Sequence, residues 1–170
     1  MRLAFGANEK GEGEKGLRVL LESIVNCFPE TAGAEYGEIT LFNDKDMAFT
    51  FAAATGKERD EAFSGEQFKL TLDEGDKIFT QKVMESKNPL IINDVNDYVM
   101  SGADRDMVER LGIRSMAIFP MFAGNRFVGS ISFDYGGHEH RFTQQDINGM
   151  HGLADLASLM IDYAERLVGP

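Results

Sequence analysis

Apolar positions recur at two spacings along the chain, and these spacings predict its helices and strands. Between residues 17 and 28 they recur every three or four positions, which is typical of one helix face. Pro29 is expected to end or kink this helix, because proline lacks the amide hydrogen that the helix needs. Residues 37–43 and 47–55 alternate apolar and polar side chains across a short polar connection, which predicts a β-hairpin.

The middle of the chain is expected to alternate short strands with helices. We expect a polar stretch at residues 56–66, a strand at 68–72 and a helix at 73–86. A second strand is expected at 90–92 and a short helix at 104–111. Asp73 is expected to cap the first of these helices, because acidic side chains accept hydrogen bonds from the free amides of a first turn. Gly112 is expected to close the second.

The last third of the chain gives the clearest prediction. Strands are expected at 115–122 and 126–135, followed by a helix from Thr143 to about Leu167. Thr143 and Asp146 have the spacing of a capping box. Antiparallel strands with helices gathered on their flanks predict an α+β layer fold.

Length and glycine content define the expected domain. At 170 residues the chain is long enough for one core, with little left for a second domain. Residues 6–16 are rich in glycine and charge. We therefore expect a flexible lead-in over residues 1–16 and a single domain over 17–168.

The charge balance argues against anionic partners. The formal net charge is −11, and the basic residues are scattered among acids. Such a chain repels phosphate backbones and anionic membrane surfaces, so neither nucleic acid nor membrane is expected as a partner. No apolar run reaches the length of a membrane helix, and Cys27 is the sole cysteine. These features predict a cytoplasmic protein.

Five short stretches together resemble one known family. They are TAGAE, PLIINDV, LGIRSMAIFPM, FVGSISF and RFTQQD, at residues 31–35, 89–95, 111–121, 127–133 and 141–146. Their order and spacing are similar to those of the GAF domain family, the small sensory modules of signalling proteins. The resemblance implies a central antiparallel sheet with the N- and C-terminal helices on one face. It also implies connecting helices over a ligand pocket on the other face.

The resemblance also allows known GAF ligands to be weighed. Phe142 and Asp146 match part of the cyclic-nucleotide signature, but Ile147 stands where glutamate is expected, and other positions differ. Cys27 lies outside the middle of the domain, where bilin-binding relatives attach their chromophore. Residues 100–114 contain no histidine to hold haem. We therefore expect no haem, bilin or flavin, and no cyclic nucleotide.

A pocket for another small molecule is expected under residues 93–115, the segment that covers the cavity in the family. The candidate ligand-binding residues are Asp94, Asp97, Tyr98, Met107, Arg114, Ser115 and Phe119. Arg114 suits an anionic group, although it has Asp94 and Asp97 as alternative partners. The alternative for the whole set is ordinary core packing. His138 and His140 are interpreted as part of an exposed turn, and neither a metal site nor a catalytic residue is predicted.

The last helix carries two apolar stripes. One steps by three and four through Ile147, Met150, Ala154, Ala157, Ile161, Ala164 and Val168. This heptad spacing predicts a parallel homodimer through the terminal helices. The alternative is that the two terminal helices use both stripes within one chain.

These features predict a sensory or regulatory domain of a signalling protein. It is expected to bind a small ligand, to transmit a signal through a homodimer, or both. The effector, such as a kinase, a cyclase or a transcriptional activator, would lie in a longer protein or act in trans. A pure dimerisation module with a filled cavity is the main alternative, and a small metabolic enzyme is the other.

Overall fold

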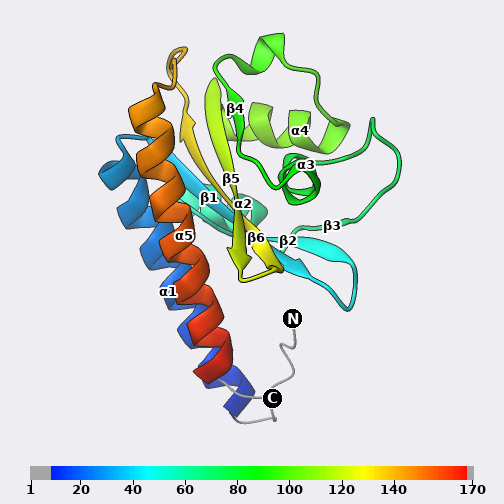
Figure 1. The fold of residues 1–170 in the computed structure, drawn as a ribbon, viewed down its shortest axis with the longest axis vertical. Coiled ribbons are helices and arrows are strands. Elements are labelled where there is room, and N and C mark those ends of the chain that lie inside the picture. Colours follow the sequence, from blue (N-terminus) through cyan, green and yellow to red (C-terminus); the bar gives the residue numbers. More distant parts are fainter. Residues whose placement is uncertain (1–8, 168–170) are drawn as a thin grey trace.

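A computed structural model describes residues 9–167 and shows a six-stranded antiparallel sheet between two layers of helices (Figure 1). The strand order is β3-β2-β1-β6-β5-β4. The strands are β1 Tyr36–Asn43, β2 Ala48–Ala54, β3 Gln67–Lys69, β4 Leu90–Ile92, β5 Ser115–Ala123 and β6 Arg126–Tyr135. The α+β fold expected from the sequence is confirmed.

The terminal helices cover one face of the sheet. These are α1 (Glu9–Ala32) and α5 (Gln144–Leu167), which lie side by side (Figure 1). Their apolar stripes pack on alternate residues of the central strands, including Ile39, Ile131 and Phe133. This layer forms the larger core of the domain.

Helix α1 differs from its prediction at both ends. It begins at Glu9, so residues 9–16 are helical although the sequence predicts a flexible lead-in there; residues 1–8 lie outside the described part. It also continues through Pro29 to Ala32. Pro29 cannot bond the carbonyl of Val25, and the Thr55 hydroxyl donates to that carbonyl instead. Cys27, predicted on the apolar side of this helix, is exposed.

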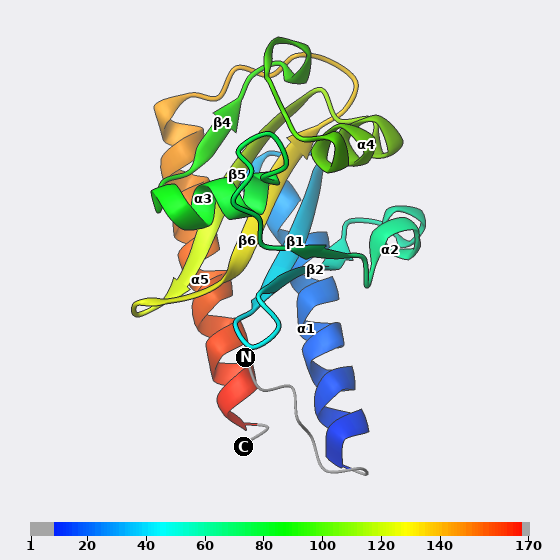
Figure 2. The ribbon, with the colours of Figure 1, turned by 90° about the vertical axis from the view of Figure 1, so that its right-hand side faces the viewer.

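The opposite face carries α2 (Lys57–Phe63), α3 (Phe79–Ser86), a single 3₁₀ turn at Val95–Asp97 and α4 (Gly102–Leu111). Figure 2 looks onto this face, with α3 and α4 in front of the strands. The sequence did not predict α2, which lies in the stretch expected to be polar and irregular. Phe63, Phe79 and Val108 bring these helices into a second core on the sheet.

Helix α3 is shorter than predicted and takes its cap from elsewhere. It begins at Phe79, so the expected cap at Asp73 is wrong. Asp73 instead accepts a hydrogen bond from Gly75 within a turn. The acceptor for the Phe79 amide is Asp104 of α4, at 3.1 Å, and Ser101 fixes that carboxylate. The cap thus comes from a residue that the local sequence does not reveal.

Two predicted helix ends are confirmed. Asp146 accepts from the Thr143 amide at 2.8 Å, and Thr143 accepts from the Asp146 amide at 3.2 Å, which completes the capping box of α5. Gly112 ends α4 with a φ of 66°, a conformation that favours glycine. Among the described residues, every helix is too short or too polar to cross a bilayer.

Candidate functional site

A row of polar side chains lies on the sheet face that α3 and α4 cover. On β1 the row holds Glu38 and Thr40, and on β6 it holds Ser130, Ser132 and Asp134. Successive strand residues point to opposite faces, so these residues share one face while their neighbours pack under α1 and α5. Asp134 is completely buried and Glu38 is 4% exposed. Two carboxyl groups therefore lie in the interior of the protein.

The two carboxyl groups share one hydroxyl. Ser132 Oγ lies 3.4 Å from Glu38 Oε2 and 3.2 Å from Asp134 Oδ2. A serine hydroxyl has one hydrogen to donate, so it serves one carboxylate at a time. Glu38 Oε1 and Asp134 Oδ1 are buried and have no hydrogen-bond partner among the residues that the structure describes. The site thus offers two free acceptor oxygens.

Burial sets the protonation of this pair. It raises the pKa of Glu38 to about 7, against the opposing attraction of the Arg59 guanidinium. Burial also raises the pKa of Asp134 well above its usual range, and the neighbouring Glu38 raises it further. Like charges at close range disfavour double ionisation. The pair therefore tends to keep a proton at neutral pH.

Arg59 of α2 reaches the same cluster from the side. Its guanidinium carbon lies 3.5 Å from the centre of the Tyr36 ring, and Nη2 donates to the carbonyl of Leu111. Its Nη1 lies 4.0 Å from Glu38 Oε1. Nη1 is buried, and within residues 9–167 it has no hydrogen-bond partner. One cation thus lies beside two carboxyl groups without a direct hydrogen bond to either.

A small cavity adjoins Glu38 beneath α3. It has about 20 Å³ of space for the centre of a water molecule, and its walls include Phe79, Met116 and Ile118. A water molecule needs about 10–15 Å³ by this measure, so the cavity has room for roughly one. Thr80 and Ser130, 2.8 Å apart, bond each other across its edge.

A family profile for the GAF domain matches residues 14–162. The chain belongs to the GAF domain family. The match covers almost all of the described residues, and it agrees with the arrangement of sheet and helices given above. A comparison with curated proteins gave no match.

Solved structures share this GAF fold at low sequence identity. The GAF domain of a phosphoenolpyruvate-protein phosphotransferase from Coxiella burnetii is 15% identical, with a TM-score of 0.71 over 88% of this chain and 84% of that one. A putative two-component sensor histidine kinase domain from Sinorhizobium meliloti is 20% identical, with a TM-score of 0.58 over 90% and 97%. The free methionine-R-sulfoxide reductase from Neisseria meningitidis, solved with its substrate, is 14% identical, with a TM-score of 0.66 over 96% of each chain.

The GAF site residues predicted from sequence fall in two groups. Asp94, Asp97 and Tyr98 line one open surface hollow of about 400 Å³, together with Glu139 and Arg141. Arg114 lies next to this hollow, and its Nη2 bonds Asp94 Oδ2 at 2.5 Å. The partner of Arg114 in the structure is therefore Asp94, one of the two alternatives that the sequence left open.

The other predicted residues lie elsewhere in the domain. Met107 is partly buried in the core between α4 and the sheet. Ser115 is completely buried, donating to the Asn93 carbonyl at 2.6 Å and accepting from the His140 amide at 2.7 Å. Phe119 packs in the core under α1 and α5, on the opposite side of the sheet. Its expected place in a pocket wall is wrong. Side chains alternate between the two faces of a strand, and Phe119 lies on the same face of β5 as Ala117 and Met121, under α1 and α5.

Sequence reasoning missed Glu38, Arg59 and Asp134 as a group. Polar residues that alternate with apolar ones in a strand are normally interpreted as a solvated face. One clue was available in the sequence. Both central strands have such a polar face, and the connecting helices must pack on that face, so its polar residues are expected to be buried. Arg59 gave no clue, because α2 itself was not predicted.

Metal ligands form no comparable cluster. Within the part of the chain that the structure describes, no three His, Cys, Asp or Glu side chains converge to hold a metal ion. His140 stacks on Tyr135 at 3.8 Å between ring centres, and His138 Nδ1 lies 3.9 Å from Glu35 Oε1. The polar cluster around Glu38 therefore remains the strongest candidate site.

Proposed function

We propose that this GAF domain is a cytoplasmic sensory or regulatory module that binds a small polar ligand at the Glu38–Asp134 pair. Its family supports a regulatory role, as do neighbours of the same fold described as parts of a sensor kinase and a phosphotransferase. The observation that carries the proposal is the pair of buried, unpartnered carboxyl oxygens. Such atoms are costly to leave without a partner.

The free atoms indicate what kind of ligand fits. An ionised carboxylate accepts hydrogen bonds and attracts positive charge, so a ligand that brings amine or amide donors would bond Glu38 and favour loss of the proton that the Glu38–Asp134 pair retains. Such a ligand differs from the anionic ligand that the sequence suggested for Arg114. In the structure the Arg114 side chain forms an ion pair with Asp94.

The cavity must widen to hold anything larger than water. Its outer wall is the start of α3, which follows a loop between β3 and α3 with the 91% exposed Leu72. Movement of this loop and of α3 opens the site without disturbing the larger core under α1 and α5. We therefore place the entrance on the α3 side.

Native mass spectrometry and thermal shift test this proposal. Purified protein is screened against small amines, amino acids and amides, and a ligand is expected to raise the melting temperature of the parent. Glu38→Gln should need at least ten times more ligand for the same rise in melting temperature. Asp97→Asn, a change at an exposed residue, should need no more ligand than the parent. A ligand that stabilises Glu38→Gln as well as the parent contradicts the proposed site.

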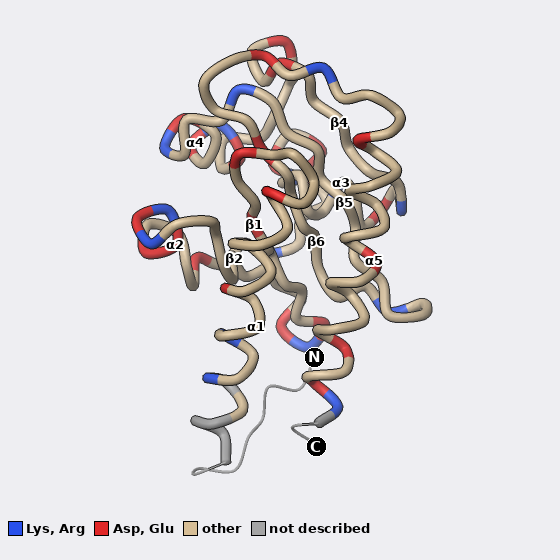
Figure 3. Tube along the Cα trace, turned by 90° about the vertical axis from the view of Figure 1, so that its left-hand side faces the viewer, with Lys and Arg blue, Asp and Glu red and all other residues tan. Residues whose placement is uncertain are grey.

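We further propose that the terminal helices transmit the output through a homodimer to an effector such as a kinase, a cyclase or a transcriptional activator. The predicted heptad seam is not the interface, because Met150, Ala154, Ala157 and Ile161 are buried within one chain, while Val168 lies outside the described residues. Exposed apolar residues remain on another face of α5, at Leu156, Leu159 and Tyr163. Figure 3 views this side of the molecule and shows charges of both signs side by side on α2 and at the end of α5.

A dimerisation module with a filled cavity is the second candidate. The cavity volume of about 20 Å³ favours it, since the surrounding side chains nearly fill a cavity of that size. It predicts a dimer that no small molecule stabilises. A catalytic role has less support, although one neighbour is a reductase. Cys27 is exposed on α1, on the opposite side of the sheet from Glu38.

A further inference from the structure

Two neighbouring residues of α2 reach different parts of the domain. Arg59 enters the buried cluster of Glu38, and Asp60 contacts the N-terminal helix. Consecutive helix residues point about 100° apart, so one short helix can contact two places at once. Helix α2 therefore lies between the candidate pocket and a terminal helix.

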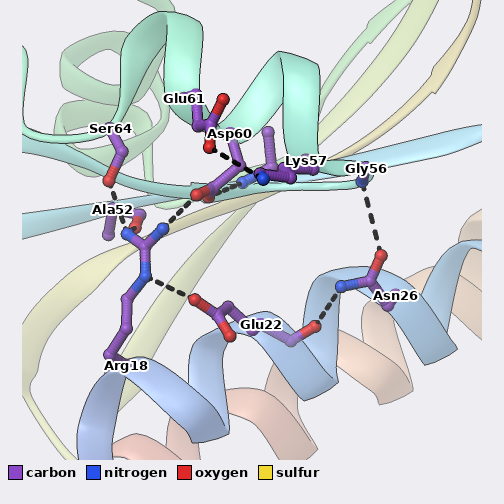
Figure 4. A network of polar contacts seen from close by, with 10 residues as sticks. Arg18, Glu22, Asn26, Ala52, Gly56, Lys57, Asp60, Glu61 and Ser64 are labelled. Carbon is purple, nitrogen blue, oxygen red and sulfur yellow. Dashed lines mark hydrogen bonds and ion pairs between the residues drawn. The ribbon is translucent and has the colours of Figure 1, made fainter. Parts of the chain in front are cut away.

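The contact with α1 is centred on Arg18 (Figure 4). Its guanidinium bonds the Asp60 carboxylate, and its Nη1 donates to the Ala52 carbonyl at 2.8 Å and to Ser64 Oγ at 2.5 Å. Its Nε bonds Glu22 at 2.7 Å. One arginine of α1 thus joins the strand before α2, the body of α2 and the residue after it.

The contact with the pocket is incomplete. Arg59 Nη1 and Glu38 Oε1 form a buried ion pair at 4.0 Å, and neither atom has a hydrogen-bond partner among the described residues. A hydrogen bond between such atoms is usually about 2.9 Å long. A shift of roughly 1 Å would join them in a hydrogen bond. Protonation of Glu38 would remove the negative charge that favours this approach.

Side chains, rather than helix length, determine where α2 sits. It has seven residues, Lys57–Phe63, and the residue before it, Gly56, provides no side-chain cap. Phe63 anchors its end in the core, where Arg110 of α4 stacks on the ring at 4.0 Å and donates to the Ala62 carbonyl. The position of α2 therefore depends on side-chain contacts, the inward contact of Arg59 among them.

We propose that α2 couples the pocket to the N-terminal helix, with Arg59 responding to the state of Glu38 and Asp60 passing the displacement to Arg18. The role of the pocket as a ligand site rests on the function proposed above. The coupling itself needs only the charged contacts described here. Other groups facing Arg59 are Asp134 of β6, Tyr36 of β1 and the Leu111 carbonyl of α4.

Hydrogen exchange on the full chain, without ligand, tests the coupling. Four proteins are compared: the parent, Glu38→Gln, Asp60→Asn and the double variant. Glu38→Gln keeps the side-chain shape and removes the charge that attracts Arg59. We expect it to speed exchange at least fivefold both in residues 57–63 and in residues 18–26, with the amides of α5 within twofold of the parent.

The double variant is decisive. With Asp60→Asn in place, Glu38→Gln should still speed exchange in residues 57–63 but should add less than twofold in residues 18–26. The charged contact of Asp60 with Arg18 is then lost, and among the described residues α1 keeps hydrogen bonds to the two ends of α2 only through the uncharged groups of Ser64 and Gly56. Lys57→Gln, which breaks the exposed Lys57–Glu61 pair on the same helix, is the matched control and should leave residues 18–26 unchanged. Arg59→Gln provides an independent perturbation of the same contact and should act as Glu38→Gln does.

Two results would overturn the coupling. One is an effect of Glu38→Gln on residues 18–26 that stays fivefold in the Asp60→Asn background, since it then does not pass through Asp60. The other is unchanged exchange in residues 18–26 when residues 57–63 respond. Because no ligand is used, neither result depends on whether the proposed ligand site is correct.

Discussion

Glu38 brings an ionisable group to the middle of the sheet, and its surroundings favour the uncharged form. Burial raises its pKa to about 7. In an unfolded chain a glutamate loses its proton near pH 4.3, at about the value of a free side chain. Between these two pH values the folded protein holds a proton that the unfolded chain has released.

The first prediction concerns the resulting pH dependence. A raised pKa in the folded state stabilises the fold at low pH, and this contribution is lost as pH rises through about 7. Glu38→Gln cannot lose a proton, so its free energy of unfolding should fall less than that of the parent between about pH 5 and about pH 8. Urea unfolding at several pH values measures the difference.

The control for this measurement is Glu58→Gln, an exposed glutamate of α2. The free energy of unfolding of this variant should change with pH as that of the parent does. Asp104, whose pKa burial raises to about 6, contributes in the same direction and is unchanged in both variants. A parental slope in Glu38→Gln would contradict the raised pKa of Glu38 and would leave Asp134 as the group that holds the proton of the pair.

The second prediction concerns the cap that Asp104 gives to α3. Asp104→Ala leaves the buried Phe79 amide without an acceptor, and unfolding free energy should fall by about 1–3 kcal/mol. Asp104→Asn keeps an acceptor oxygen and should recover part of the loss. Asp106→Ala on the same helix removes only an exposed ion pair and should cost about 0.5 kcal/mol or less. Equal losses in the two alanine variants would contradict the cap.

At the scale of single elements, two glycines are expected to respond in opposite directions. Gly152 lies in α5 with open space around its Cα, so Gly152→Ala should stabilise the protein by about 0.5–1 kcal/mol through helix propensity. A Cβ at Gly129 of β6 would lie 2.1 Å from the backbone oxygen of Thr40. Gly129→Ala should therefore destabilise by more than about 2 kcal/mol. Urea unfolding of both variants checks the pair, and a stable Gly129→Ala would mean that β1 and β6 can separate locally.

Elements with strong local signals could be predicted from sequence. The strands 115–122 and 126–135 and the capping box at Thr143 are confirmed because alternation and capping chemistry lie within the segments themselves. The extension of α1 past Pro29 could not be predicted, because it depends on Thr55, a residue of the hairpin. The true cap of α3 is likewise contributed by α4.

The candidate site was harder to predict for the same reason. Asp94 and Arg114 were both predicted as ligand-binding residues, with Asp94 and Asp97 as alternative partners of Arg114, because they lie in the segment that the family resemblance emphasises; the structure pairs Arg114 with Asp94. Glu38, Arg59 and Asp134 come from three separate elements and meet only when β1 pairs with β6 and α2 packs beside them. Distant pairing is not visible in a single sequence.

At the scale of the whole molecule, the interface on α5 can be tested. Leu159 is 62% exposed in the single chain, so Leu159→Glu should leave the fold and the melting temperature intact. If this face joins two chains, a buried charge there is costly, and sedimentation should show a monomer where the parent is a dimer. Leu72→Glu, at a residue 91% exposed on the other side of the sheet, is the control and should stay dimeric. A monomeric parent at tens of micromolar would contradict the homodimer.

The strand order has a consequence for synthesis. β1 lies at the centre of the sheet, yet one of its two neighbours is β6, whose Asp134 pairs with Tyr36. At the usual rate of ~5–20 residues per second, the ribosome needs roughly 5–20 s to deliver that partner after β1 has been made. During this interval β1 presents an open edge, and the apolar stripe of α1 lacks most of its sheet. A chain interrupted before residue 126 is therefore expected to aggregate or to bind chaperones instead of forming a smaller stable domain.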